Sequence, residues 1–113
     1  ILPRFIGVNE ERVFVMYLDI KNNLLGSEFA AKGSLTNVSM DFRKIIDGVL
    51  KYNAVNVVIA HNHPGGIALP SADDINSTRA LSDALRLVNA KLYDHIVVAD
   101  NEFVSFKDSD IEF

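Results

Sequence analysis

The sequence predicts a mixed α/β (α+β) domain, and three observations lead to that prediction. The chain has 113 residues, of which 49% are hydrophobic and 23% charged, with only 6 glycines and 3 prolines. This length and balance fit one globular domain that buries roughly two thirds of its unfolded surface. Segments rich in β-branched and aromatic residues occur together with segments of helical periodicity, without the strict alternation of a parallel βαβ fold.

The first part of the chain begins with an expected strand and its hairpin partner. Arg12 to Ile20 is rich in β-branched and aromatic residues and is continuously apolar, so we expect both of its faces to be covered. Lys21 to Asn23 has the composition of a turn, and Leu24 to Ala31 is the expected partner strand. Gly33 to Asn37 follows no regular pattern and is expected to be irregular.

A first helix is expected over Met40 to Tyr52, with Ser39 as its N-cap. Its apolar residues recur at i, i+3, i+4, i+7 and i+8, a spacing that places side chains on one helix face. These residues are Phe42, Ile45, Ile46, Val49 and Leu50. Gly48 lies within the segment and lowers its helix propensity.

The rest of the chain contains the same two kinds of segment. Ala54 to Ala60 is a Val-rich run expected to be a central strand, and Asn62 to Pro70, with two prolines and two glycines, is the loop after it. A helix is expected from Ser71 to about Val88. Lys91 to Ala99 is an expected strand, and Phe103 to Phe106 is a short closing strand after a turn.

The composition excludes several classes of protein and of site. With no cysteine, the chain cannot form a disulfide framework, a cysteine zinc site or a thiol nucleophile. The net charge of −4 and the pI near 5.2 come without the basic stripe that binds duplex DNA. No segment is long and apolar enough to cross a membrane, and no signal peptide is visible. We therefore expect a cytoplasmic protein that by itself binds neither membrane nor duplex DNA.

One segment, His61 to Asp74, concentrates residue types that bind metal ions. His61 and His63 are two residues apart at the end of an expected strand, where the strand period of two puts both imidazoles on the same side. Asp74 follows one loop later in the first turn of the next helix, so its carboxylate can return as a third ligand. Two histidines and one carboxylate leave a fourth tetrahedral position open, which is typical of catalytic zinc sites.

The same residues also have ordinary structural interpretations. Ser71 and Asp74 match S-x-x-D, the pattern of a helix capping box, and taken alone that interpretation is favoured. Asn62 is expected on the opposite strand face, where its side chain serves the backbone. His95 lies within an apolar strand, where we expect a core or edge histidine whose hydrogen bonds are satisfied.

The run H-x-H, seven residues and S-x-x-D resembles the signature of JAMM (MPN+) metalloprotease domains. Seven residues, Pro64 to Pro70, do separate His63 from Ser71. The segment is more similar still to the RadC family, whose hallmark is H-N-H-P-S-G followed by P-S-x-x-D. Other stretches agree with that family: Y-L-D-I-K-N-N, K-G-S-L, Y-D-H-I-V-V and V-S-F. Gly65 departs from the pattern, which usually has serine there.

The resemblance implies a cytidine-deaminase-like fold, in which a mixed sheet carries helices on both faces. Because it covers nearly the whole chain, residues 1–113 are expected to be a single RadC-like JAB/MPN domain. The chain does not begin with methionine, so we expect this domain to be excised from a longer protein. The resemblance also implies that His61, His63 and Asp74 bind Zn²⁺ and that Ser71 stabilises the oxyanion.

The resemblance further implies a glutamate from an early strand as general base. Glu11 is the expected residue because it begins the strand that ends in L-D, whereas Glu10 would face the other way and Glu28 belongs to the hairpin partner. We therefore expect a zinc-dependent hydrolase that cleaves a peptide or isopeptide amide in a peptide or protein substrate. The alternatives are a non-catalytic metal-binding interaction module, a DNA-repair role within a larger RadC protein, and a 2-His-1-carboxylate iron oxygenase.

Overall fold

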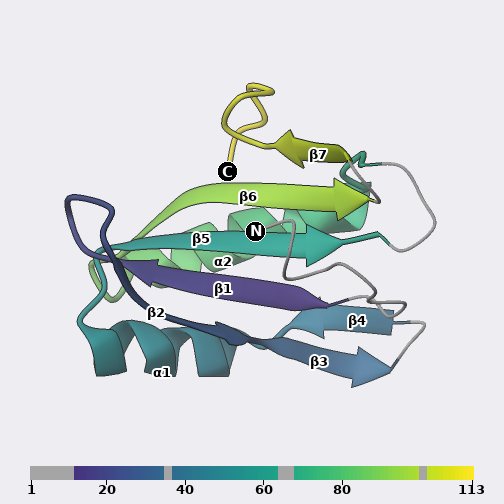
Figure 1. Ribbon diagram of the computed structural model, residues 1–113. Coiled ribbons are helices and arrows are strands. Elements are labelled where there is room, and N and C mark those ends of the chain that lie inside the picture. The colour runs from purple at the N-terminus through teal and green to yellow at the C-terminus, as the bar shows by residue number, and fades with distance from the viewer. Residues whose placement is uncertain (1–11, 35–36, 64–67, 100–101) are drawn as a thin grey trace.

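A five-stranded mixed sheet is the centre of the computed structural model, which describes residues 12–34, 37–63, 68–99 and 102–113 (Figure 1). The strand order is β2-β1-β5-β6-β7. The strands are β1 (Val13–Leu18), β2 (Leu24–Phe29), β5 (Asn56–Asn62), β6 (Lys91–Ala99) and β7 (Glu102–Ser105). The central pair β5 and β6 is parallel, and the other neighbouring pairs are antiparallel. The mixed α/β (α+β) fold class predicted from the sequence is confirmed.

A separate two-stranded antiparallel sheet follows β2. It consists of β3 (Ala31–Ser34) and β4 (Asn37–Met40), with residue 31 paired to residue 40. The expectation of an irregular segment over Gly33 to Asn37 is therefore wrong at both ends. Strands of four residues are too short to show a period of two, and their glycine, serine and asparagine are typical of turns.

Helix α1 (Phe42–Tyr52) begins after a different cap from the expected one. The side chain of Asp41 accepts a hydrogen bond from Lys44 N at 3.1 Å, whereas Ser39 lies in β4. Because β4 continues through residue 40, the helix cannot begin until the strand has ended. The apolar stripe is also narrower than expected, since the side chain of Leu50 is 63% exposed. Its other members are buried or partly buried: Phe42, Ile45, Ile46 and Val49.

Helix α2 (Ala72–Arg86) begins where the sequence predicts, with Ser71 as its N-cap. It ends two residues before the predicted end at Val88. Thr78, Leu81 and Leu85 are buried on its sheet-facing side. No helix in the part of the chain that the structure describes is long and apolar enough to cross a membrane.

Both described helices contact the same face of the large sheet, which differs from the implied arrangement with helices on both faces. One core cluster joins alternate residues of β1 to both helices, and Figure 1 shows α2 behind β5 and β6. Its members from β1, α1 and α2 are Val13, Val15, Tyr17, Ile45, Val49, Leu81 and Leu85. Alternate residues on the other face form a second small cluster of Phe14, Ala60 and Val98. Strand β1 is therefore buried on both faces, as predicted, but the helices cover only one.

Candidate metal centre

The two histidines lie at the carboxyl end of β5 and face the helices. His61 pairs with Val13 of β1 and with Val97 of β6, so it stands in the middle of the sheet and its side chain is only 6% exposed. His63 follows the strand, and its backbone N–H donates to Val98 O at 2.7 Å. This bond continues the ladder past the end of β5, so residues 61 and 63 keep the strand alternation and share a face. The side chain of His63 is 22% exposed.

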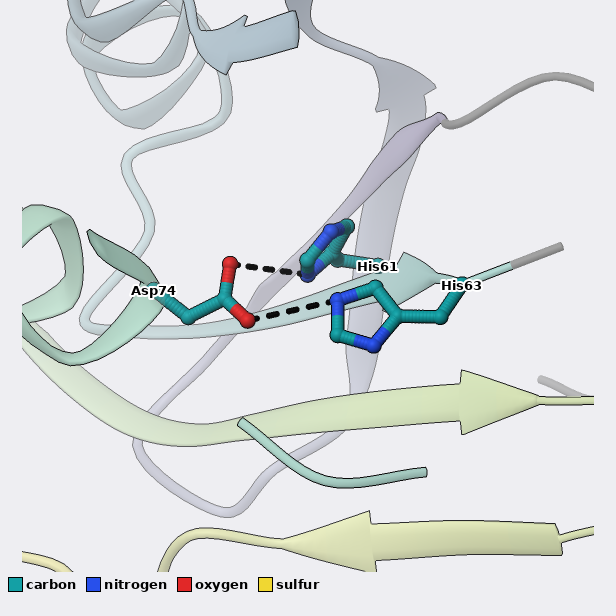
Figure 2. Close-up of side chains that lie close together, drawn as sticks. All are labelled: His61, His63 and Asp74. Carbon is teal, nitrogen blue, oxygen red and sulfur yellow. Dashed lines mark ion pairs between the residues drawn. The ribbon is translucent and has the colours of Figure 1, made fainter. Parts of the chain in front are cut away.

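Asp74, in the first turn of α2, faces both imidazoles, as Figure 2 shows. Its Oδ1 lies 3.6 Å from His61 Nδ1, and its Oδ2 lies 3.3 Å from His63 Nε2. The two imidazole rings are edge to face, with centroids 4.5 Å apart. One ligand atom from each of the three residues lies within 4.8 Å of the others, so this group could hold a metal ion.

The capping box expected at the start of α2 is present in full. Ser71 N–H donates to Asp74 Oδ2 at 2.8 Å, and Asp74 N–H donates to Ser71 Oγ at 3.0 Å. The two bonds fix the carboxylate relative to the helix end, where the helix dipole favours negative charge. Asp74 is therefore a capping residue and a member of the His–His–Asp group at the same time.

Several groups act on the charge of the Asp74 carboxylate. Burial favours the neutral acid and is the strongest single influence on its pKa. The backbone N–H of Ser71, the neighbouring His61, the Ser71 side chain and His63 all favour the ionised form. Together they outweigh burial, so the pKa of Asp74 lies below its ordinary value. The carboxylate is therefore ionised at neutral pH, as a metal ligand must be.

Asn62 links the end of β5 to the start of β1. Its Oδ1 accepts a hydrogen bond from Arg12 N–H at 2.5 Å, and its own N–H donates to Arg12 O at 3.3 Å. The prediction that its side chain serves the backbone is confirmed.

The glutamates considered as general base are only partly within the described residues. Glu11, the expected base, and Glu10 both lie outside the described ranges. Glu28 is engaged elsewhere, because its Oε2 accepts a 2.6 Å hydrogen bond from the Tyr17 hydroxyl and its Oε1 lies 4.0 Å from Lys44 Nζ. Burial, reinforced by this bond to Glu28, raises the pKa of Tyr17.

Sequence reasoning did not connect Thr78 and His95 with this site. Thr78 Oγ1 donates to the backbone oxygen of Asp74 at 2.5 Å and lies 2.6 Å from His95 Nδ1. His95 is buried, its ring stacks on Phe106, and it lies 5.8 Å from the His61 ring. Its Nε2 has no hydrogen-bond partner among the described residues, so the expectation of a satisfied histidine is wrong for one nitrogen. The sequence feature that could have indicated this contact is Thr78, which lies one helical turn after Asp74.

The chain is similar to known proteins over most of its length. The family model for the RadC-like JAB domain matches residues 2–111. The UPF0758 protein Bcen2424_2501 of Burkholderia cenocepacia is 44% identical over 102 residues, which are 89% of this chain and 40% of that protein. The UPF0758 protein VV0285 of Vibrio vulnificus is 42% identical over 98 residues, which are 87% of this chain and 44% of that protein. The chain thus spans about two fifths of the length of the curated relatives it matches, and it belongs to the RadC-like JAB domain family.

Proposed function

We propose that this chain is a zinc-dependent hydrolase of the JAMM type that cleaves a peptide or isopeptide amide. The observation that carries the proposal is the convergence of His61, His63 and Asp74, whose ligand atoms lie within 4.8 Å of one another. Membership of the JAB-like domains, which include metal-dependent hydrolases, supports it.

The donor set of this group fits Zn²⁺. Two imidazole nitrogens and one carboxylate oxygen are ligand types that zinc prefers, and three protein ligands leave one position open. A tetrahedral ion with bonds of about 2.0–2.1 Å separates its ligand atoms by about 3.3 Å. Asp74 lies 3.6 Å from His61 and 3.3 Å from His63, through different carboxylate oxygens, and one ligand atom from each residue lies within 4.8 Å of the others. The side chains would therefore have to draw closer together to enclose an ion.

Each residue has a distinct part in the proposed reaction. Zn²⁺ bound in such a site supplies Lewis-acid chemistry, lowering the pKa of water and polarising a carbonyl. Asp74 contributes the negative charge that retains the cation. Ser71 Oγ accepts from Asp74 N–H, which leaves its own hydrogen to be donated to the oxyanion that develops on the substrate.

Glu11 is the proposed general base, which takes a proton from water and passes it to the leaving amine. Two observations support this choice over Glu28. The carboxylate of Glu28 is bound by the hydroxyl of Tyr17. Arg12, the chain neighbour of Glu11, is hydrogen bonded through its backbone N–H and C=O to Asn62, which lies between the two histidines.

Metal content tests the ligand assignment directly. Asp74→Asn keeps the shape of the side chain and an oxygen that can accept from Ser71 N–H, but it removes the negative charge. We expect elemental analysis to find stoichiometric zinc in the wild-type protein and little in this variant. Asp73→Asn is the matched control, because Asp73 is exposed on the same helical turn. Full zinc content in Asp74→Asn would contradict the ligand role, and a wild-type protein that never retains zinc would contradict the proposal.

Activity tests the base and the substrate class separately. The probes are a quenched-fluorescence peptide mixture and a fluorogenic peptide joined through a lysine isopeptide bond. We expect Glu11→Gln to retain zinc but lose hydrolysis, with Glu10→Gln as the control that retains both. A fully active Glu11→Gln would rule out this base. A zinc-loaded wild-type protein that cleaves neither probe class would count against an amidase and for a metal-binding interaction module.

Peptide or protein is the substrate class we propose, rather than duplex DNA. The net charge of −4 opposes binding to phosphates, which depends on clustered lysine and arginine. A filter-binding titration at low salt with a random-sequence duplex should therefore show weak binding. Tight, salt-sensitive binding by this chain would contradict the choice and favour a role in DNA repair.

A further inference from the structure

We propose that His95 and Thr78 form a positioning pair that holds Asp74 in its metal-binding orientation, an inference that rests on the proposed function. The pair joins the helix that carries Asp74 to the sheet that carries the two histidines. His95 lies in β6, directly beside β5, and Thr78 lies in α2 one turn after Asp74. Neither residue belongs to the His–His–Asp group itself.

The direction of the hydrogen bonds follows from counting hydrogens. The Thr78 hydroxyl has one hydrogen, which it donates to the backbone oxygen of Asp74 at 2.5 Å. The 2.6 Å contact between Thr78 Oγ1 and His95 Nδ1 must then be donated by the imidazole. His95 therefore carries its proton on Nδ1, and its Nε2 is a bare acceptor.

These bonds form one continuous path from the sheet to the proposed ligand. The His95 N–H holds the Thr78 hydroxyl, and that hydroxyl holds the Asp74 carbonyl at the first turn of α2. The same turn contains the capping bonds between Asp74 and Ser71. The start of α2 is thus held against the sheet through Thr78 and His95, and its first turn is held by the capping bonds of Ser71. Both sets of bonds include Asp74.

The unpartnered Nε2 argues that His95 serves the site rather than the stability of the fold. Its side chain is buried, and Nε2 has no partner in the described part of the chain. A buried acceptor without a partner destabilises the folded state, whereas an apolar side chain of similar size has no such cost.

A structural role and a positioning role make opposite predictions for one double variant. Thr78→Val with His95→Leu removes both partners of the hydrogen bond and the bare acceptor, so the metal-free protein should unfold near the wild-type denaturant midpoint. Its Zn²⁺ affinity, measured by competition with a chromophoric chelator, should nevertheless fall about tenfold, in the range of lost outer-sphere support. A merely structural pair would instead lower the midpoint and leave the affinity unchanged.

Single variants sharpen this test. We expect Thr78→Val to lower Zn²⁺ affinity in the same way and Thr78→Ser, which keeps the hydroxyl, to restore it. Ser82→Ala is the matched control, because Ser82 is the next buried polar residue of α2 and lies one turn further from Asp74. Wild-type affinity in a folded Thr78→Val variant would overturn the inference.

Measurements on the metal-free protein separate failure of this inference from failure of the proposed function. A wild-type protein without zinc affinity would remove the function, but the positioning pair could still be judged by NMR. Imidazole nitrogen shifts should show Nδ1–H and a bare Nε2 in His95. Hydrogen exchange of the Asp74 amide, which donates to Ser71 Oγ, should speed up in Thr78→Val. The opposite tautomer, or unchanged exchange, would overturn the inference without any metal measurement.

Discussion

Acid should destabilise the metal-free protein chiefly through the buried His95. Its pKa falls from 6.5 to about 3 on folding, first because burial disfavours the charged ring and then because His61 lies nearby. Between these two values the unfolded chain binds a proton that the folded chain excludes. Stability is therefore complete above about pH 6.5 and falls as the pH is lowered toward 3. Each pH unit costs about 1.4 kcal/mol, so the loss at pH 4.5 is about 3 kcal/mol.

That loss is a large part of the 5–15 kcal/mol by which a domain of this size is usually stable. Urea unfolding with a chelator present, at pH 7.5 and at pH 4.5, measures it in the wild-type protein and in His95→Leu. We expect the wild-type protein to lose about 3 kcal/mol more than the variant. The lowered pKa of Asp74 does not disturb the comparison, because its stabilising effect is lost only below about 3.8. Equal losses in the two proteins would refute the assignment of the acid sensitivity to His95.

Three substitutions test contacts that stabilise the fold. Gly48→Ala should lower the free energy of unfolding by about 2 kcal/mol, because the new Cβ would lie 2.1 Å from Tyr17 Cζ and Oη. This clash outweighs the gain in helix propensity. An unchanged thermal midpoint would contradict the prediction. Asp41→Ala should cost about 1 kcal/mol by removing the bond to Lys44 N, and a urea midpoint equal to that of the wild-type protein would show that the cap is dispensable. Tyr17→Phe should cost about 1 kcal/mol through the lost bond to Glu28, and a stabilised variant would mean that burying the hydroxyl outweighs that bond.

The elements that could be predicted from the sequence are those whose patterns are long. Strands β1, β5 and β6 each contain an apolar run of at least four residues, and α2 has a cap and an apolar face. Each of these elements therefore lies within a few residues of its predicted place. The hairpin of β3 and β4 was missed because its strands have four residues each and a composition typical of turns. The N-cap of α1 is Asp41 rather than Ser39, because Ser39 belongs to the missed strand β4 and the helix begins only after that strand ends.

The proposed ligands could be predicted because they lie close together in the chain. His61, His63 and Asp74 fall within one strand end, one loop and one helical turn, so local periodicity is enough to bring them together. His95 could not be assigned in this way, because its orientation depends on pairing between strands. The register of β5 against β6 shifts by one residue between Val57 and Val58, and a shift of one residue exchanges the two faces of a strand. That shift is what turns His95 toward Thr78, and no local pattern predicts it.

The sequence presented the capping box and the metal site as competing interpretations of Asp74, and the structure shows why both can hold. An ionised carboxylate has two oxygens with about four acceptor positions, so a bond from Ser71 N–H occupies only one of them. The remaining positions face His61 and His63. Because the capping bonds orient the carboxylate before any cation arrives, less conformational entropy is lost when one binds. The helix end that stabilises the fold is thus the same element that prepares the proposed site.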